Sequence, residues 1–262
     1  MPGSDGLAAV GRQFGALSRR SVIAVARQPG VVIPPFVFPL LLFALTSQGL
    51  ASADRLPGFR GTYRDFAFAI PFAQGAIFAA TIAGTNIARD IQDGFLRRLA
   101  MTPMRAVSLL TAHVAGVVVL TAAQAVVFSL VGIVIGVHMQ AGLAGWLVLI
   151  GLAIANGLAF ASFGAVLAVR TGSTEAVQGL FPVLFALLTL STLNIPLHLI
   201  TVAWFHDVAA VNPISQVLAA LRSLIIDGWA PRTLAVGFLA ALAVAAVALL
   251  AAGRLLRSRL PV

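Results

Sequence analysis

The chain has 262 residues, of which 60% are hydrophobic and only 10% are charged, and its mean hydropathy is +1.02. A soluble domain typically has about 45–50% apolar and about 25% charged residues, so this composition excludes an ordinary soluble fold and indicates a multi-pass membrane protein. The formal charge is +9, and all seventeen cationic side chains are arginine. They lie between apolar runs rather than along one soluble face, which argues against a nucleic-acid partner.

Residues 1–30 form a basic segment before the first apolar run. Leu7, Val10, Phe14 and Leu17 recur at spacings of three and four, while the arginines recur at a spacing of seven. This pattern predicts an amphipathic helix in the cytoplasmic membrane interface, with its arginines facing anionic lipid head groups. A frayed cytoplasmic tail is the alternative.

A membrane-spanning helix needs about 20 mostly apolar residues. Six segments meet this requirement: 31–50, 66–87, 107–137, 142–169, 176–200 and 233–252. We therefore expect an all-α membrane protein whose residues 1–262 form one membrane domain, with the interfacial helix over 1–30 and a six-span bundle over 31–262. Twelve of the seventeen arginines lie in the terminal segments and in the second and fourth connections. Since arginine-rich segments stay in the cytoplasm, both termini are predicted to be cytoplasmic, in the inner membrane of the cell.

The connection "ARDIQDGFLRRLAMTPMR", residues 88–105, has six charged residues among its eighteen. The apolar side chains gather on one face of a helix that would begin near Arg89 and end before Pro103: Ile91, Phe95, Leu96 and Leu99. Asp90 and Asp93 would lie in the first turn, where the helix dipole favours negative charge. Gly94 in the interior would cost about 1 kcal/mol relative to alanine. The pattern predicts a short cytoplasmic amphipathic helix between the second and third spans, with a solvated loop as the alternative.

A second helix is predicted before the last span. After Asn212-Pro213, a turn signal, apolar residues recur at helical spacing up to Gly228. Their positions are Val217, Leu218, Leu221, Leu224 and Ile225. This pattern favours an amphipathic or re-entrant helix on the outer side of the membrane.

The sequence has no catalytic constellation. Without lysine it cannot form a Walker-A phosphate loop, and without cysteine it has no thiolate metal site. The four histidines lack metal-site spacing, so neither a metal nor another cofactor is expected in this chain. The acidic residues are all peripheral to the spans, which argues against an ion-coupled secondary carrier, the alternative from another functional class. Four polar residues within the spans could line a translocation path, although interhelical hydrogen bonding is the favoured interpretation: Gln74, Asn86, Gln124 and Asn156.

The stretch "ARDIQDGFLRRLAMTPMRAVSLLTAHVAG" resembles the signature of type-2 ABC exporter permeases, especially the daunorubicin-resistance branch. The matching positions are Asp90, Gly94, Leu96, Arg98, Leu99, Thr102, Pro103 and Arg105. A second resemblance lies in "VNPISQVLAALRSLIIDG", at Asn212, Pro213, Ala220, Leu221, Arg222 and Gly228. The chain departs from the family in having Arg89-Asp90 where an acidic residue usually precedes arginine, and Phe95 where Thr or Ser usually follows the glycine.

The resemblance implies a permease subunit that exports a hydrophobic drug, antibiotic or lipid-like compound. A polysaccharide-exporter permease is the nearest alternative within the class. Two copies of a separate ABC ATPase subunit would bind ATP and magnesium, and a second permease chain would complete a homodimer or a related heterodimer within the membrane lipid. The charged connection would be the coupling helix that contacts the ATPase, through Asp90, Ile91, Asp93, Gly94, Phe95, Leu96, Arg97, Arg98, Leu99 and Pro103. The outer helix, with Asn212, Pro213, Leu221 and Arg222, would help to close the exit.

Overall fold

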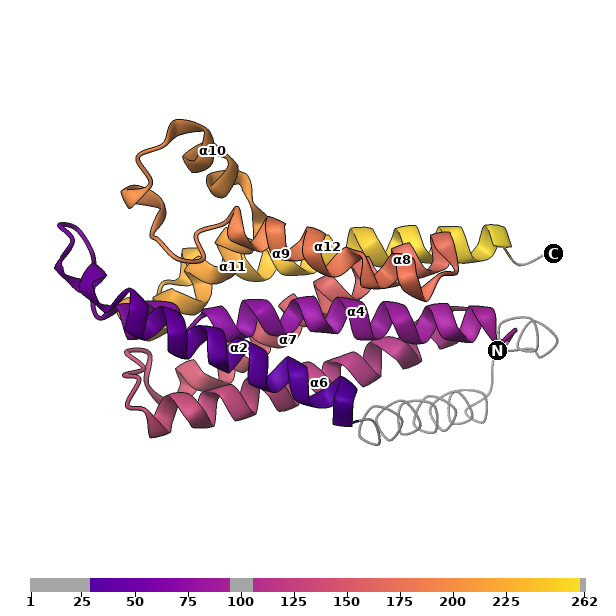
Figure 1. Cartoon of the computed structure of the whole chain (residues 1–262), viewed down its shortest axis with the longest axis horizontal. Coiled ribbons are helices and arrows are strands. Elements are labelled where there is room, and N and C mark those ends of the chain that lie inside the picture. Colours follow the sequence, from indigo (N-terminus) through magenta and orange to yellow (C-terminus); the bar gives the residue numbers. More distant parts are fainter. Residues whose placement is uncertain (1–28, 95–105, 260–262) are drawn as a thin grey trace, which may run out of the picture.

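The computed structural model describes residues 29–94 and 106–259, and within these ranges the chain is helical and has no β-strand. Five long helices lie side by side along one common axis (Figure 1). Their bounds are α2 (Pro29–Gly49), α4 (Ile70–Gln92), α6 (Ala106–Val134), α7 (Gly142–Thr171) and α12 (Pro231–Arg259). The all-α class is therefore confirmed. The predicted interfacial helix falls almost wholly on residues 1–28, outside the described residues.

Four helices in the described ranges are long and apolar enough to cross a membrane. They are Tyr63–Gln92, which includes α3 (Tyr63–Ala67), Gly116–Val134, Gly142–Thr171 and Pro231–Leu255. A fifth span results if α10 (Ala203–Val211) and the helical stretch Pro213–Asp227 count as one, although the two are bent by 79°. Two further apolar helices, Ile33–Gly49 and Thr174–Thr189, are shorter than a full span. Six spans remain a prediction.

The predicted span 176–200 is helical only in its first half. Its helices are α8 (Thr174–Gln178) and α9 (Leu180–Thr189), after which residues 190–202 form turns around a short 3-10 helix, η2 (Leu197–Leu199). Pro196 disfavours helical geometry at the residue before it. In addition, the carbonyl groups at the end of α9 are bound by side chains from elsewhere in the fold, as described below. A continuous helix over 176–200 was therefore the wrong expectation.

The predicted boundary between the second span and the charged connection also differs from the structure. α4 continues without a break through Arg89 and Asp90 to Gln92, and Asp93 follows as its carboxyl cap. A new helix beginning near Arg89 was wrong, and Asp90 lies in a last turn rather than a first one. The reason is tertiary: Ile87 and Ala88 are buried against α7, α8 and α12, and Ile91 packs against the same cluster. Burial of these side chains favours one more helical turn than the local charge pattern does.

α7 lies at the centre of the bundle, in contact with α4, α6 and α12. The approach of α4 is close because the facing residues are small. A Cβ atom added at Gly164 of α7 would lie 2.0 Å from the carbonyl oxygen of Ala80, and one added at Gly84 of α4 would lie 2.8 Å from that of Gly164. Small residues at such positions let membrane helices pack backbone against backbone.

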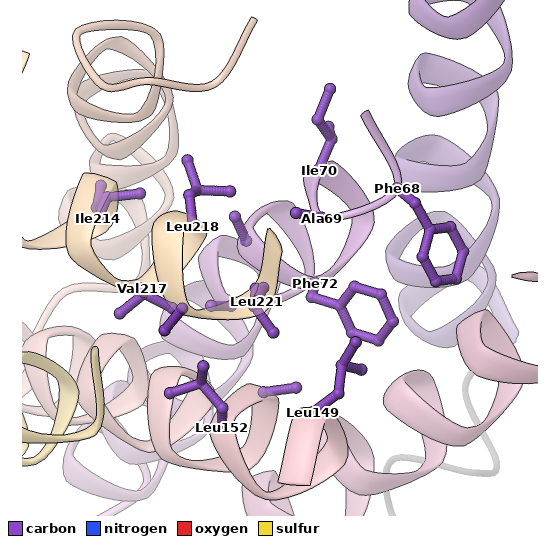
Figure 2. Packing of buried hydrophobic residues seen from close by; sticks show 14 of the residues in the cluster. Phe68, Ala69, Ile70, Phe72, Leu149, Leu152, Ile214, Val217, Leu218 and Leu221 are labelled. Atoms are coloured by element: carbon purple, nitrogen blue, oxygen red, sulfur yellow. The ribbon is translucent and has the colours of Figure 1, made fainter. Parts of the chain in front are cut away.

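The largest hydrophobic cluster joins the break between α3 and α4 to α7 and to α11 (Pro213–Arg222). Phe72 and Leu149 approach each other at its centre, while Leu218 and Leu221 of α11 enter from one side (Figure 2). Ile214, Val217, Leu218 and Leu221 are all buried. α11 is thus an integral part of the core rather than a helix lying on its surface.

The helices alternate in direction, so the connections gather at two ends of the bundle. The carboxyl ends of α4, α7 and α12 lie at one end, and the connections after α2, α6 and α9 lie at the other, together with α10 (Figure 1). We call the second end the loop end; it comprises residues 50–62, 135–141 and 190–230. Hydrogen bonds tie it together, among them those from Arg64 to the carbonyls of Ile135 and Gly136, both 3.0 Å long.

Candidate functional site

The most unusual side chain of the described chain is Arg222, the last residue of α11. It is only 6% exposed, and each of its three guanidinium nitrogens donates to a backbone carbonyl. Nε donates to Phe66 (3.0 Å), Nη1 to Thr192 (2.5 Å) and Nη2 to Leu193 (2.6 Å). One arginine therefore joins α11, the end of α3 and the turn after α9.

The ring of Phe66 adds a second contact. The guanidinium carbon of Arg222 lies 3.5 Å from the centroid of this ring, in cation–π geometry. Within the described ranges, no carboxylate lies within ion-pair distance of Arg222. The positive charge is stabilised by carbonyl dipoles and one aromatic ring alone, which leaves it without a formal counter-charge.

Asn212, the amino-terminal cap of α11, and Ser215 of α11 also bind the end of α9 and the turn after it. Asn212 accepts the N–H of Ile214 (2.9 Å), which caps the helix, and its Nδ2 donates to the carbonyls of Leu187 (2.9 Å) and Leu190 (3.2 Å). The Ser215 hydroxyl accepts the N–H of Thr192 (3.1 Å). Asn212, Ser215 and Arg222 are separated by three and seven residues, so they share one helix face, which we call the α11 polar stripe.

The turn after α9 is held from the opposite side by the first residue of α3 and by the connection that precedes α3. The hydroxyl of Tyr63 donates to the carbonyl of Asn194 (3.0 Å), and Nε2 of His198 lies 3.1 Å from the carbonyl oxygen of Gly58. The turn is thus clamped between two parts of the chain that are more than 100 residues apart. No side-chain pattern could have identified these acceptors, because they are main-chain carbonyls.

A cavity of about 640 Å³ opens between the α11 polar stripe and the connection that precedes α3. Ser215 and Arg222 line it from α11, while Gly58 and His198 line it from the two connections. Arg60 and Asp227 also line it, and they are 3.7 Å apart (Nη1 to Oδ1). Their side chains are 82% and 50% exposed, so this ion pair is open to solvent.

A separate cavity of about 310 Å³ lies among α7, α9, α11 and α12. Its lining is apolar except for Asn156, and includes Phe160, Leu184 and Val217. Asn156 is 2% exposed, and its Nδ2 has no hydrogen-bond partner among the described residues. An apolar, roomy cavity with one polar residue in its lining is the arrangement expected of a site for a hydrophobic ligand.

Gln124 has an identifiable structural task. Its Nε2 donates to the carbonyl of Pro35 in α2 (2.8 Å). That carbonyl would normally accept the N–H four residues later, but residue 39 is also proline and has no N–H. Gln124 thus replaces the hydrogen bond that Pro39 cannot make, as membrane helices containing proline require. This bond agrees with the interhelical interpretation favoured from sequence.

Two of the four polar span residues, Gln124 and Asn156, line different cavities in the described part of the chain. Gln124 lines a cavity of about 10 Å³, large enough for one water molecule, whereas Asn156 lines the 310 Å³ cavity. Gln74 and Asn86, both on α4, line neither of them. Of the four, Asn156 is the residue that the fold places beside a space of ligand size.

The predicted coupling residues are described only in part. Asp90 and Ile91 belong to the last turn of α4, Asp93 caps the helix, and Gly94 has φ +67°. This left-handed conformation suits glycine at the end of a helix and redirects the chain there. The remaining predicted coupling residues lie outside the described residues: Phe95, Leu96, Arg97, Arg98, Leu99 and Pro103.

A helical bundle with four or five apolar, membrane-length helices defines a multi-pass membrane protein. The family model described as ABC-2 type transporter matches residues 12–226, which is most of the chain. The protein therefore belongs to the ABC-2 type transporter family, as its resemblance to type-2 ABC permeases predicted. A comparison with curated proteins finds no match.

Proposed function

We propose that this protein is the membrane permease subunit of an ABC exporter, moving a hydrophobic drug, antibiotic or lipid-like compound out of the cell across the inner membrane. The family supports a transporter component. Because the chain has no lysine and hence no Walker-A loop, ATP and magnesium would be bound by a separate ATPase subunit.

The observation that carries the substrate class is the 310 Å³ cavity beside Asn156. Ligand sites of about 300–1,000 Å³ with mostly apolar walls and few polar groups are typical for drug-sized molecules. Asn156 is the single polar residue of this lining, and its amide would give such a ligand one hydrogen-bonding partner. An ion or a highly hydroxylated sugar chain would find few partners in such a cavity. This favours a hydrophobic substrate over a polysaccharide.

Energy from the ATPase would enter through the segment that follows Gly94. α4 extends from this point to the core around Phe72, so it links the proposed coupling segment to the centre of the bundle. Its close contact with α7 at Gly84 and Gly164 would make the two helices move together. A displacement at the end of α4 would then reach α7, which carries Asn156.

The assembly would contain two ATPase subunits and a second permease chain, either identical or related. Several apolar side chains are highly exposed in the single chain, among them Val134 (85%), Leu143 (83%) and Leu147 (70%). Lipid or a second permease chain would cover them.

The experiment is co-purification followed by measurement of ATPase activity. The tagged chain is extracted in mild detergent with its ATPase, the pair is reconstituted in vesicles, and hydrophobic compounds are tested for stimulation. Asn156→Leu should reduce this stimulation, whereas Ser162→Ala should not, because the Ser162 hydroxyl is buried on the same helix but already bound to Leu158 (2.6 Å). Leu99→Asp should remove the ATPase subunit while membrane insertion is retained. Transport that continued without the ATPase and followed a proton gradient would contradict the proposal.

A further inference from the structure

The 640 Å³ cavity at the loop end is lined by Arg222, whose terminal nitrogens carry N–H groups that no described residue accepts. Each terminal guanidinium nitrogen carries two hydrogens, and the described chain provides one acceptor for each nitrogen, at Thr192 and Leu193. Two N–H groups therefore remain available on a side chain that lines the cavity. The Ser215 hydroxyl, which also lines the cavity, accepts the N–H of Thr192 and keeps its own proton to donate.

The charge of the cavity points to the kind of ligand. Arg60 and Asp227 both line it and form an ion pair, so their charges offset each other. His198 carries no negative charge. The excess positive charge is that of Arg222, which is 94% buried and has no carboxylate within ion-pair distance among the described residues. A buried cation is costly unless an anion accompanies it.

We propose that this cavity binds a phosphate group through the two available N–H groups of Arg222 and the hydroxyl of Ser215. A guanidinium presents its N–H groups in a fixed fork that matches phosphate oxygens. The site is distinct from the apolar cavity: Ser215, Ala219 and Arg222 lie on one face of α11, whereas Pro213, Ile214 and Val217 line the other cavity from a different face. It does not depend on which compound the protein exports.

Two sources could supply the anion: the head group of an anionic lipid, or a small soluble anion. The full chain is placed in nanodiscs of phosphatidylcholine alone, of phosphatidylcholine with phosphatidylglycerol, or of phosphatidylcholine with inorganic phosphate added. The midpoint of thermal unfolding is followed by tryptophan fluorescence. Ligand binding to the folded chain should raise the midpoint by about 3 °C or more at saturation. A rise with phosphatidylglycerol alone identifies a lipid head group, and a rise with phosphate identifies a soluble anion.

Two variants test whether the effect arises in this cavity. Arg222→Gln removes the charge, but it also removes bonds that hold the fold. Ala219→Leu therefore provides an independent test, since a larger side chain at this cavity-lining position fills space while the guanidinium and its three carbonyl partners stay in place. Both variants should lose the anion-dependent rise, and Arg232→Gln, which removes an exposed arginine at the start of α12, should keep it.

Two results would overturn the proposal. One is the lack of any rise in the wild-type chain with either anion, which would leave Arg222 with a purely structural role. The other is a rise of equal size in Arg222→Gln and Ala219→Leu, which would show that the anion acts elsewhere. Native mass spectrometry that counts retained phosphatidylglycerol in the wild type and in Ala219→Leu gives a readout independent of stability.

Discussion

Arg222 binds Phe66 twice: its Nε donates to the Phe66 carbonyl (3.0 Å), and its guanidinium carbon lies 3.5 Å from the centroid of the Phe66 ring. Phe66 is in the last turn of α3, where carbonyl groups lack intrahelical partners. Thr192 and Leu193, the other two acceptors, follow the end of α9. The arginine thus provides hydrogen-bond donors for carbonyl groups at the ends of two helices, α3 and α9. Its positive charge is also favourable near the carboxyl end of a helix.

The first prediction concerns Arg222→Lys. Lysine keeps the charge, but a single ammonium on a flexible stem cannot reach three carbonyls in fixed directions or stack flat on a ring. Bonds to charged groups contribute about 1.5–3 kcal/mol each, so we expect a loss of at least about 3 kcal/mol and a fall of roughly 6–12 °C in the unfolding midpoint. Thermal unfolding in detergent measures this. Arg232→Lys is the control, and an Arg222→Lys midpoint within about 2 °C of wild type would contradict the carbonyl clamp.

The second prediction separates the two tasks of Asn212. Its Oδ1 caps α11, while its Nδ2 binds the carbonyls of Leu187 and Leu190. Asn212→Ser keeps a capping oxygen but is too short to bridge to α9, whereas Asn212→Ala loses both. The serine variant should be more stable than the alanine variant by about 1 kcal/mol, the contribution of the cap. It should still be less stable than wild type by about 1–3 kcal/mol, because the bonds to the Leu187 and Leu190 carbonyls are lost.

Chemical unfolding of the three proteins provides this comparison. Thr189→Ala serves as the control, because the Thr189 hydroxyl is exposed and bonds only within its own helix. Serine and alanine variants of equal stability would show that the cap contributes nothing.

The third prediction tests the contact between α4 and α7. Gly164→Ala would bring a Cβ atom to 2.0 Å from the Ala80 carbonyl oxygen, so the two backbones must separate. We expect a loss of about 1–3 kcal/mol, as in overpacked cores. Gly151→Ala on the same helix is the matched control. Its nearest neighbour would be the Phe238 ring at 3.9 Å, so this change should be neutral or slightly stabilising, because alanine favours helix. Equal midpoints for both variants would rule out the close approach.

The fourth prediction concerns membrane topology. The chain has no natural cysteine, so single cysteines can be introduced without background. Arg60→Cys lies at the loop end with its parent side chain 82% exposed, and Gln92→Cys lies at the exposed carboxyl end of α4. With both termini in the cytoplasm, a membrane-impermeant maleimide added to intact cells should label Arg60→Cys only, and Gln92→Cys should react after the cells are opened. The reverse pattern would invert the proposed orientation.

The fifth prediction concerns the exit from α4. Gly94 has φ +67°, and a Cβ added there would meet nothing within 4 Å, so the cost of substitution comes from the backbone alone. Gly94→Ala should disfavour this conformation by about 1–2 kcal/mol, whereas asparagine tolerates it better. If the following segment contacts the ATPase, Gly94→Ala should lower the amount of ATPase that co-purifies, and Gly94→Asn should lower it less. Equal recovery with both variants would separate this turn from coupling.

Hydropathy and capping signals act over a few neighbouring residues, so the membrane class, the all-α fold and the helix that begins after Asn212 could all be predicted from the sequence. The sequence also singled out Asn156, a polar residue in an apolar run, which the fold places beside the 310 Å³ cavity. The prediction of a helix beginning near Arg89 was wrong, because distant contacts there outweigh the local charge pattern. Ile91 packs against the cluster that α7, α8 and α12 form, and α4 continues beyond Arg89.

The contacts of Arg222 could not be predicted from its neighbours in the sequence. It counts there as one of five arginines in outer connections and as a matching position of the family resemblance, and neither observation marks it as buried. Its partners are main-chain carbonyls of Phe66, Thr192 and Leu193, at sequence separations of 156, 30 and 29 residues. Every residue type has such a carbonyl, so the acceptors have no signature in the sequence. Only the folded chain, by ending α3 and α9 beside α11, brings them to one guanidinium.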